Sequence, residues 1–270
     1  MIVYVVRYQL EGHTLWGVLR GDAVTPVPGE FPTTGDFLRG TALPELAALT
    51  GPSVALSSVR LLAPVTRNQQ FVCQGANYRA HMLESGIDPE AKTFNMIFTK
   101  ASSCIVPADS DVVRPRRVRL LDYEVELGLV LKQDITGPVD VGDDNLHAYI
   151  AGAVIVNDYS ARDVQIPEMQ FYKGKSFRTF GPVGPRLALF DAQDAPLLKQ
   201  LTLRLSVNGE LRQHDSTANL VHGPAATLTE LSRVHDFQAG DLLATGTPAG
   251  CALSVPSPAK QRFAAMLPEQ

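Results

Sequence analysis

The chain has 270 residues, of which 45% are hydrophobic and 19% are charged, and its formal net charge is −4. This composition allows a packed core and argues against a nucleic-acid-binding protein, because the basic stretch Arg114–Arg119 is short and isolated. No apolar stretch reaches the roughly 20 residues that a membrane helix needs. Three widely spaced cysteines argue against a disulfide framework. The short apolar N-terminus is predicted to be a first strand rather than a signal peptide, so we expect a cytoplasmic protein.

The first 65 residues contain short apolar runs separated by turn signals such as Leu10-Glu11-Gly12. One helical stretch is predicted near Leu43–Leu49, and Leu61–Pro64 is typical of a crossing segment. We therefore predict a small β-rich N-terminal domain over residues 1–65 and a larger catalytic domain over residues 66–270.

The larger domain is predicted to be mostly β with a few helices, without βαβ alternation. Asn77 is expected to cap a short helix over Tyr78–Ser85 that Gly86 ends. Residues 87–96 are mostly polar and predict a mobile lid. The remaining predicted elements are strands at 96–106, 118–132, 149–157, 184–190, 200–208 and 211–214, a long loop at 159–182, a hairpin turn at Asn208-Gly209, a helix at 226–234 and a last strand at Leu242–Thr245.

Acidic residues alternate along one of these predicted strands. Asp122, Glu124 and Glu126 would share a face, each about 6.6 Å from the next, and Asp158 follows the buried run Ala151–Val156. Such a row could be a solvated edge strand. The alternative is that Glu124, Glu126 and Asp158 bind one divalent cation, and an all-oxygen donor set favours Mg²⁺, Mn²⁺ or Ca²⁺ over zinc.

Three further groups of residues are candidates for chemistry. His81 and Glu84 would share a helical face, either as an ordinary surface pair or as an acid–base pair. The stretch from Arg162 to Lys175 is either a solvated basic loop or an anion clamp. The turn Thr245–Gly250 could hold a carboxylate with hydroxyl and backbone N–H groups.

Taken together, these segments resemble the fumarylacetoacetate hydrolase family. The resemblance covers about residues 70–250 and is carried by Asn77–Glu84, Phe98–Lys100, Leu121–Leu127, Asn157–Gln165, Lys173–Phe177, Gly181–Pro185, Val207–Glu210 and Thr245–Gly250.

The resemblance implies a mixed β-sandwich roll, a homodimer, and Mg²⁺ or Mn²⁺ (with Ca²⁺ as an alternative) as the cofactor. It also implies a small carboxylate substrate, with no nucleic-acid or membrane partner. The site residues it implies are Glu124, Glu126 and Asp158 for the metal, His81, Glu84 and Lys175 for catalysis, and Lys100, Arg162, Gln165 and Thr247 for substrate binding.

The chain departs from the family pattern at two places. Arg178 stands where the family commonly has Asp. If its side chain points into the cavity, we expect it to bind a second substrate carboxylate; if it points to solvent, we expect the family's simpler acylpyruvates as substrates. After Gly250 the family normally continues to a glycine-rich turn and a closing strand, and the sequence here does not show that pattern. We expect either that the end of the protein is missing from this chain or that the closing strand is supplied differently.

The function implied by the resemblance is hydrolysis of a carbon–carbon bond in 2,4-dioxo acids, such as acylpyruvates and fumarylpyruvate, through a metal-bound enolate. A decarboxylase or isomerase acting on 2-oxo or hydroxydiene diacids is the alternative on the same scaffold. A binding protein that kept the fold without the chemistry is the least favoured interpretation.

Overall fold

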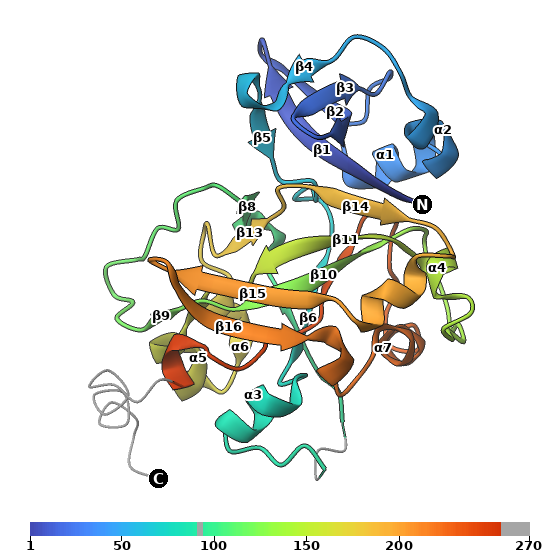
Figure 1. Cartoon of the computed structure of the whole chain (residues 1–270). Helices are drawn as coiled ribbons and strands as arrows, with labels where there is room; N and C mark the ends of the chain where they lie inside the picture. Colours follow the sequence, from blue (N-terminus) through green and yellow to red (C-terminus); the bar gives the residue numbers. More distant parts are fainter. Residues whose placement is uncertain (91–93, 255–270) are drawn as a thin grey trace.

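One large sheet runs through both parts of the molecule in the computed structural model, which describes residues 1–90 and 94–254 (Figure 1). The N-terminal part contains β1 (Ile2–Leu10), β2 (His13–Arg20), β3 (Ala23–Pro26), α1 (Thr34–Gly40), α2 (Leu43–Ala48), β4 (Val54–Ala55) and β5 (Arg60–Leu62). Thr33 caps α1 through a capping box with Asp36. The predicted helix at 43–49 corresponds to α2, whereas α1 was not predicted.

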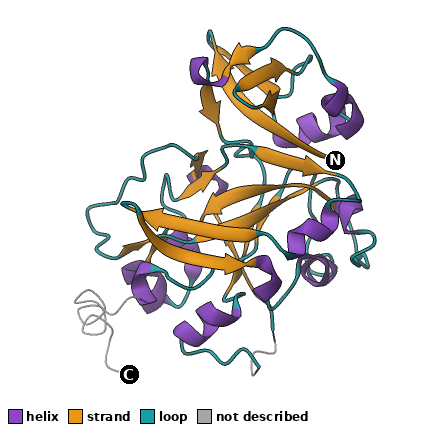
Figure 2. Ribbon diagram, viewed as in Figure 1, coloured by secondary structure: helices purple, strands orange, loops and turns teal. Residues whose placement is uncertain are grey.

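The larger part is mostly β with a few helices, as predicted (Figure 2). Its strands are β6 (Phe71–Gly75), β7 (Met96–Lys100), β8 (Ile105–Pro107), β9 (Leu121–Asp122), β10 (Val125–Leu131), β11 (Ile150–Asn157), β12 (Ser160–Ala161), β13 (Gly181–Val183), β14 (Leu187–Phe190), β15 (Thr202–Val207), β16 (Glu210–Ser216) and β17 (Leu242–Ala244). Its helices are α3 (Arg79–Glu84), α4 (Leu146–Tyr149), α5 (Arg162–Glu168), α6 (Phe171–Lys175) and α7 (Pro224–Leu231).

The strand order of the large sheet is β4-β3-β2-β1-β14-β11-β10-β17-β6-β7, with β5, β8 and β13 attached beside it. Most pairs are antiparallel, while β17 pairs with β6 and β13 with β8 in parallel. The sheet is therefore mixed. The β15–β16 hairpin forms a separate ribbon (Figure 1), and positive φ angles at Asn208 (53°) and Gly209 (83°) confirm the predicted turn.

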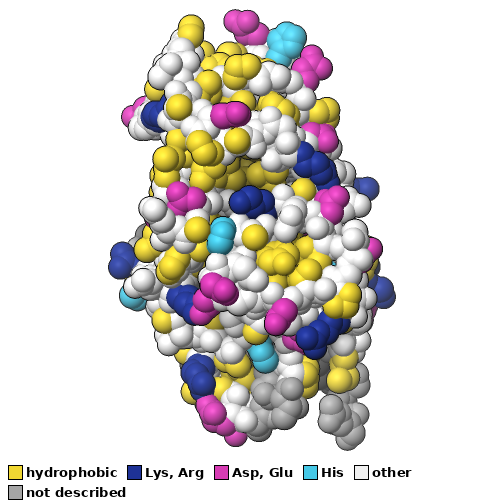
Figure 3. Space-filling view, turned by 90° about the vertical axis from the view of Figure 1, so that its right-hand side faces the viewer, with side chains coloured by type: hydrophobic (Ala, Val, Ile, Leu, Met, Phe, Trp, Pro, Cys, Tyr) yellow, Lys and Arg dark blue, Asp and Glu magenta, His cyan; other side chains and the backbone are white. Residues whose placement is uncertain are grey.

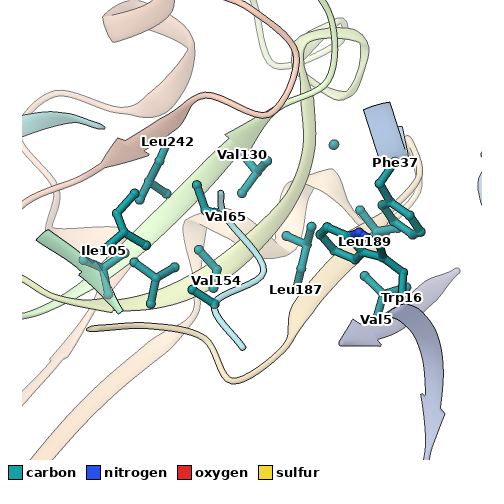
Figure 4. Packing of buried hydrophobic residues seen from close by; sticks show 14 of the residues in the cluster. Val5, Trp16, Phe37, Val65, Ile105, Val130, Val154, Leu187, Leu189 and Leu242 are labelled. Carbon is teal, nitrogen blue, oxygen red and sulfur yellow. The ribbon is translucent and has the colours of Figure 1, made fainter. Parts of the chain in front are cut away.

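A shared hydrophobic cluster joins the N-terminal part to the larger part (Figure 4). Trp16 stacks on Phe37 with ring centroids 4.2 Å apart. These rings and Val5 belong to the same cluster as Leu187 and Leu189 of β14. Because β1 also pairs with β14, the core is continuous across residue 65. A domain division at that point stays a prediction.

The acidic strand is not continuous, so the prediction of three acids in one row was wrong. Strand β9 ends at Asp122 and pairs with β12, while β10 begins at Val125 and pairs with β11. The chain changes partner between them, and Asp158 N–H donates to the Glu124 carbonyl at 2.8 Å across the break. Asp122 is accordingly not part of the group that Glu124 and Glu126 form with Asp158.

The predicted long loop at 159–182 was also wrong, because this segment forms β12, α5, α6 and β13. Pro167 lies inside α5, and both helices are short, so the sequence has no clear helical period there. The predicted cap of α3 was wrong too. Tyr78 occupies the N-cap position, and the Asn77 side chain instead binds the backbone of His222 and Thr245.

The outer surface of the described residues carries mixed charge. On the face shown in Figure 3, lysine and arginine side chains are separated by acidic and uncharged ones, while hydrophobic groups gather around the junction of the two parts. Among the described residues, no helix is long and apolar enough to cross a membrane.

Candidate functional site

Three buried carboxylates meet where β10 begins and β11 ends. Glu126 lies on β10, Glu124 directly before it, and Asp158 directly after β11. One carboxylate oxygen from each lies within 4.8 Å of the others, and all three residues are buried. The structure therefore brings together the three residues expected to bind a metal. Their hard oxygen donors suit Mg²⁺ or Mn²⁺.

Two lysines neutralise part of this negative charge. Lys175 on α6 donates to Glu124 and Asp158, and Lys100 at the end of β7 donates to Asp158. Burial alone would lower the pKa of Lys175, but Asp158 and Glu124 outweigh it and raise that pKa. Lys175 thus remains an ammonium beside the acids.

Arg162, the first residue of α5, provides the third cation. Its Nε donates to Asp122 at 2.9 Å, its Nη1 to Gln165 at 2.9 Å and its Nη2 to Glu124. Asp122 also accepts the backbone N–H groups of Ala252 (2.7 Å) and Leu253 (3.2 Å). Asp122 therefore fixes both the guanidinium and the segment that follows the Thr245–Gly250 turn.

The two glutamates titrate in opposite directions. Burial would raise the pKa of Glu124, but Arg162 and Lys175 outweigh it and lower that pKa. Burial and the neighbouring Asp158 raise the pKa of Glu126 well above its usual value, despite a 2.9 Å hydrogen bond from Gly246 N–H. The negative charge of the cluster is thus not fully neutralised by the neighbouring cations, and its residues fit a divalent cation.

His81 and Glu84 lie on the same face of α3, at the mouth of this cluster. His81 Nδ1 is 3.5 Å from Glu84 Oε2, and the two side chains are 15% and 25% exposed. Glu84 also accepts the N–H of Gly250 at 3.2 Å, which ties α3 to the Thr245–Gly250 turn. Both side chains are therefore partly accessible to solvent.

A cavity of about 450 Å³ connects these groups. Its polar lining residues include His81, Glu84, Glu124, Glu126, Arg162, Gln165, Lys175 and Thr247. Its apolar lining residues include Ile87, Met96, Phe98, Ile166, Phe171, Cys251 and Leu253. The cavity therefore has a charged end and an apolar wall, which suits a small carboxylate with an apolar substituent.

Two residues expected to bind substrate do not line this cavity. The Lys100 side chain is fully buried, and its ammonium donates to Asp158, to the Phe180 carbonyl at 2.8 Å and to the Tyr159 carbonyl at 3.4 Å. These acceptors use its three donors, so Lys100 supports Asp158 from behind. Arg178 is exposed. A second-carboxylate role for Arg178 therefore has no support in the geometry.

Gln213 on β16 is a site residue that the sequence did not indicate. It is fully buried, accepts the Val125 N–H at 2.9 Å, and donates to Thr247 Oγ1 and to the Pro248 carbonyl, each at 2.8 Å. It thus joins Val125, the residue between the two glutamates, to the turn that carries Thr247. No local motif marks such a long-range contact.

Parts of two expectations fall outside the described residues. The predicted lid includes residues 91–93, and the predicted absence of a closing strand concerns residues 255–270. Neither expectation is tested by the structure.

Comparisons with known proteins agree with the fold. Residues 70–266 match the family model for the C-terminal domain of fumarylacetoacetate hydrolase, and residues 5–64 match a model named Rv2993c-like, N-terminal. The chain is similar to the oxaloacetate tautomerase YisK of Bacillus subtilis, with 35% identity over 73% of this chain and 64% of that protein, so the alignment spans under two thirds of YisK.

Two solved structures are also similar to this one. A fumarylacetoacetate hydrolase from Exiguobacterium antarcticum has a TM-score of 0.79 and 32% identity over 94% of this chain and 89% of that one. A 2-hydroxyhepta-2,4-diene-1,7-dioate isomerase from Mycobacterium marinum has a TM-score of 0.74 and 28% identity over 93% of this chain and 89% of that one.

Proposed function

This chain belongs to the fumarylacetoacetate hydrolase family, and on that premise we propose that it is a divalent-metal-dependent hydrolase of 2,4-dioxo acids. The observation that carries the proposal is the shared cavity: the His81–Glu84 pair lines the same apolar-walled space as Glu124 and Glu126, two members of the carboxylate cluster. Hydrolysis of a carbon–carbon bond needs both a group that activates water and a centre that stabilises an enolate.

Glu124, Glu126 and Asp158 would hold Mg²⁺ or Mn²⁺. When bound, such an ion supplies Lewis-acid charge that stabilises a developing enolate. The apolar wall formed by Phe98 and Phe171 would hold the acyl group, while Lys175 and Arg162 would orient the oxo-acid end of the substrate.

The protein groups would then move protons around the reacting carbons. The His81–Glu84 pair removes a proton from water, whose oxygen attacks the distal carbonyl carbon. The bond between that carbon and the adjacent methylene breaks, and its electron pair stays on the methylene carbon as an enolate. A proton returned to that carbon completes pyruvate, and the acyl group leaves as a carboxylate. Lys175 and Gln165, which both line the cavity, would donate to the oxygens that become negative.

A second function is favoured by the relatives. Similarity to an oxaloacetate tautomerase and to a hydroxyheptadienedioate isomerase supports proton transfer on a 2-oxo diacid without attack by water. The same residues would suffice, because the His81–Glu84 pair can move a proton between carbon and oxygen. A panel of acylpyruvates, fumarylpyruvate and oxaloacetate with Mg²⁺ or Mn²⁺ separates the two: hydrolysis yields pyruvate and a carboxylate, whereas tautomerisation conserves the substrate's formula.

We infer that the protein is a cytoplasmic homodimer. Support for a dimer comes from the sheet face that carries Tyr4 and Ile155, which are 41% and 47% exposed. Tyr4 pairs with Ala188, and Ala188 with Ala153, so the apolar groups share one face. Light scattering of the purified chain measures the oligomeric state directly.

A further inference from the structure

Cys251 contributes sulfur to the wall of the site cavity. It directly follows the Thr245–Gly250 turn, lines the cavity and is 1% exposed. Gln213 Nε2 lies 3.6 Å from its Sγ, and the Pro248 carbonyl 3.9 Å from it. The backbone around it is held by Asp122, which accepts the N–H groups of Ala252 and Leu253. The thiol is therefore fixed in position rather than carried on a loose segment.

Three donor atoms of different chemical type, the thiol sulfur among them, lie close together in the cavity wall. A ring nitrogen of His81, a carboxylate oxygen of Glu124 and the sulfur of Cys251 all lie within 4.8 Å of one another. They come from α3, from the residue before β10, and from the residue after the Thr245–Gly250 turn. Three ligands on one tetrahedral ion lie about 3.3–3.8 Å apart when their bonds are about 2.0–2.3 Å long. Side-chain adjustments of about an ångström would complete such a site.

We propose that His81, Glu124 and Cys251 form a second cation site that selects Zn²⁺, and that zinc bound there inhibits the enzyme. The carboxylate cluster offers oxygen alone and suits a hard cation, whereas this site offers nitrogen, oxygen and sulfur, the donors that zinc prefers over magnesium. Water would occupy the fourth position. Only the inhibition rests on the proposed function; the binding does not.

Zinc binding follows a simple proton balance. Burial and the charge of Glu124 raise the pKa of the Cys251 thiol, so without a cation the sulfur keeps its proton. When the sulfur–zinc bond forms, that proton passes to solvent, because a divalent charge stabilises the thiolate and reverses the effect of the neighbouring anions. Each zinc bound therefore releases a proton from the thiol.

The inhibition follows from the ligands that zinc would share with the reaction. Zinc would occupy a ring nitrogen of His81, so the imidazole could no longer exchange a proton with Glu84. It would also use one oxygen of Glu124, which accepts from Arg162 and Lys175 and is one of the three carboxylates that would hold Mg²⁺ or Mn²⁺. Zinc would thus bind here even when Mg²⁺ is abundant, because Mg²⁺ gains little from sulfur or imidazole.

Cobalt spectroscopy tests the site without any substrate. Co²⁺ accepts the same donors as zinc, and a cobalt–thiolate bond gives a charge-transfer absorption in the near ultraviolet. In excess Mg²⁺, the wild-type protein should develop this band on addition of Co²⁺ and lose it when Zn²⁺ is added. Cys251→Ser should abolish the band, His81→Ala should weaken cobalt binding, and Cys104→Ala should keep the band, because Cys104 is buried elsewhere in the core.

Zinc affinity, measured by competition with a chelating dye, should fall at least about tenfold in Cys251→Ser. Mutating residues that only hydrogen-bond to metal ligands already lowers metal affinity about 10–100-fold, and loss of a ligand should cost no less. Circular dichroism checks that each variant is folded. If Cys251→Ser does not fold, His81→Ala tests the same site. A wild-type protein without the band, or a band that survives in Cys251→Ser, would overturn the proposal.

An activity measurement tests the inhibition separately. Zinc inhibition of each variant is compared with its own zinc-free rate, and Cys251→Ser should need at least about tenfold more zinc for half inhibition. Equal inhibition of both proteins would place zinc in the carboxylate cluster and overturn the inhibitory role. If no substrate is turned over, the cobalt band still decides the binding, so failure of the proposed function and failure of the zinc site are distinguishable.

Discussion

Lys100 and Asp158 form an ion pair in which both side chains are completely buried. The pair lies behind the carboxylate cluster, with the Lys100 ammonium also bound to two backbone carbonyls. Breaking a buried pair by removing one partner typically costs about 3–5 kcal/mol. We expect Lys100→Met to lower the free energy of unfolding by that amount without added metal, and Mg²⁺ to restore part of it by compensating Asp158.

Urea denaturation with and without Mg²⁺ measures this effect. Lys173→Met is the matched control, because Lys173 forms an exposed pair with Glu168 at 3.2 Å, and such pairs contribute about 1 kcal/mol or less. Equal stability losses in the two variants would show that Lys100 does not support the cluster.

Glu126 is the carboxylate whose removal should affect the metal most selectively. Its raised pKa means that its neutral form is favoured without a cation, and glutamine imitates that form while its carbonyl oxygen can still accept the Gly246 N–H. Glu126→Gln should therefore fold normally, lose Mn²⁺ affinity by at least about tenfold, and lose metal-dependent turnover. Calorimetric Mn²⁺ titration with a thermal-melting control measures both properties, and unchanged Mn²⁺ affinity would exclude Glu126 as a ligand.

Metal binding should be linked to protons through the same residue. Below its raised pKa Glu126 carries a proton that a cation must displace, so the apparent metal affinity should fall as the pH falls, by at most about tenfold per pH unit for one proton. Titrations in two buffers of different ionisation enthalpy count the protons released. Glu126→Gln should release one proton fewer than the wild type, and identical counts would contradict the linkage.

The His81–Glu84 pair should affect turnover more than binding. Positioned acid–base groups contribute about 10²–10⁴-fold, so His81→Ala should lower kcat by at least about 100-fold, with a much smaller change in KM. Leu83→Ala is the control on the same helix, because Leu83 is 66% exposed. A kcat for His81→Ala equal to that of the control would remove the pair from the mechanism.

Arg178 should have no part in substrate selection. Its side chain is exposed, whereas Arg162 is buried, lines the cavity and bonds Asp122, Glu124 and Gln165. Arg178→Ala should leave the ratio of kcat/KM for mono- and dicarboxylate substrates within about twofold, while Arg162→Lys, which cannot form the same planar contacts, should lower both values. A large shift in the ratio for Arg178→Ala would restore its role in selectivity.

The sequence predicted the acids of the site better than their surroundings. Glu124, Glu126 and Asp158 could be found because carboxylates at the ends of buried strands are conspicuous. Whether Lys100 faces the cavity or the rear of Asp158 depends on packing between β7 and the cluster, which no local pattern records. Gln213 reaches Val125 from a hairpin 88 residues farther along the chain, and such contacts leave no spacing signal.

The same limit applies to the fold. Alternation and turn residues identified most strands and the Asn208-Gly209 hairpin, because these signals are local. They could not show that the strand at 118–132 changes partners between Asp122 and Val125. They also missed α5 and α6, whose short lengths and internal Pro167 hide a helical period.

The most direct test of the central claim is product analysis with a 2,4-dioxo acid and Mg²⁺ or Mn²⁺, followed by nuclear magnetic resonance. The proposed hydrolase should form pyruvate and the acyl carboxylate in equal amounts, only when the metal is present, and Glu126→Gln should form neither. The contrary result is a protein that binds the metal and exchanges protons at the methylene carbon, or interconverts tautomers, without forming any pyruvate. That result would contradict hydrolysis and favour the tautomerase.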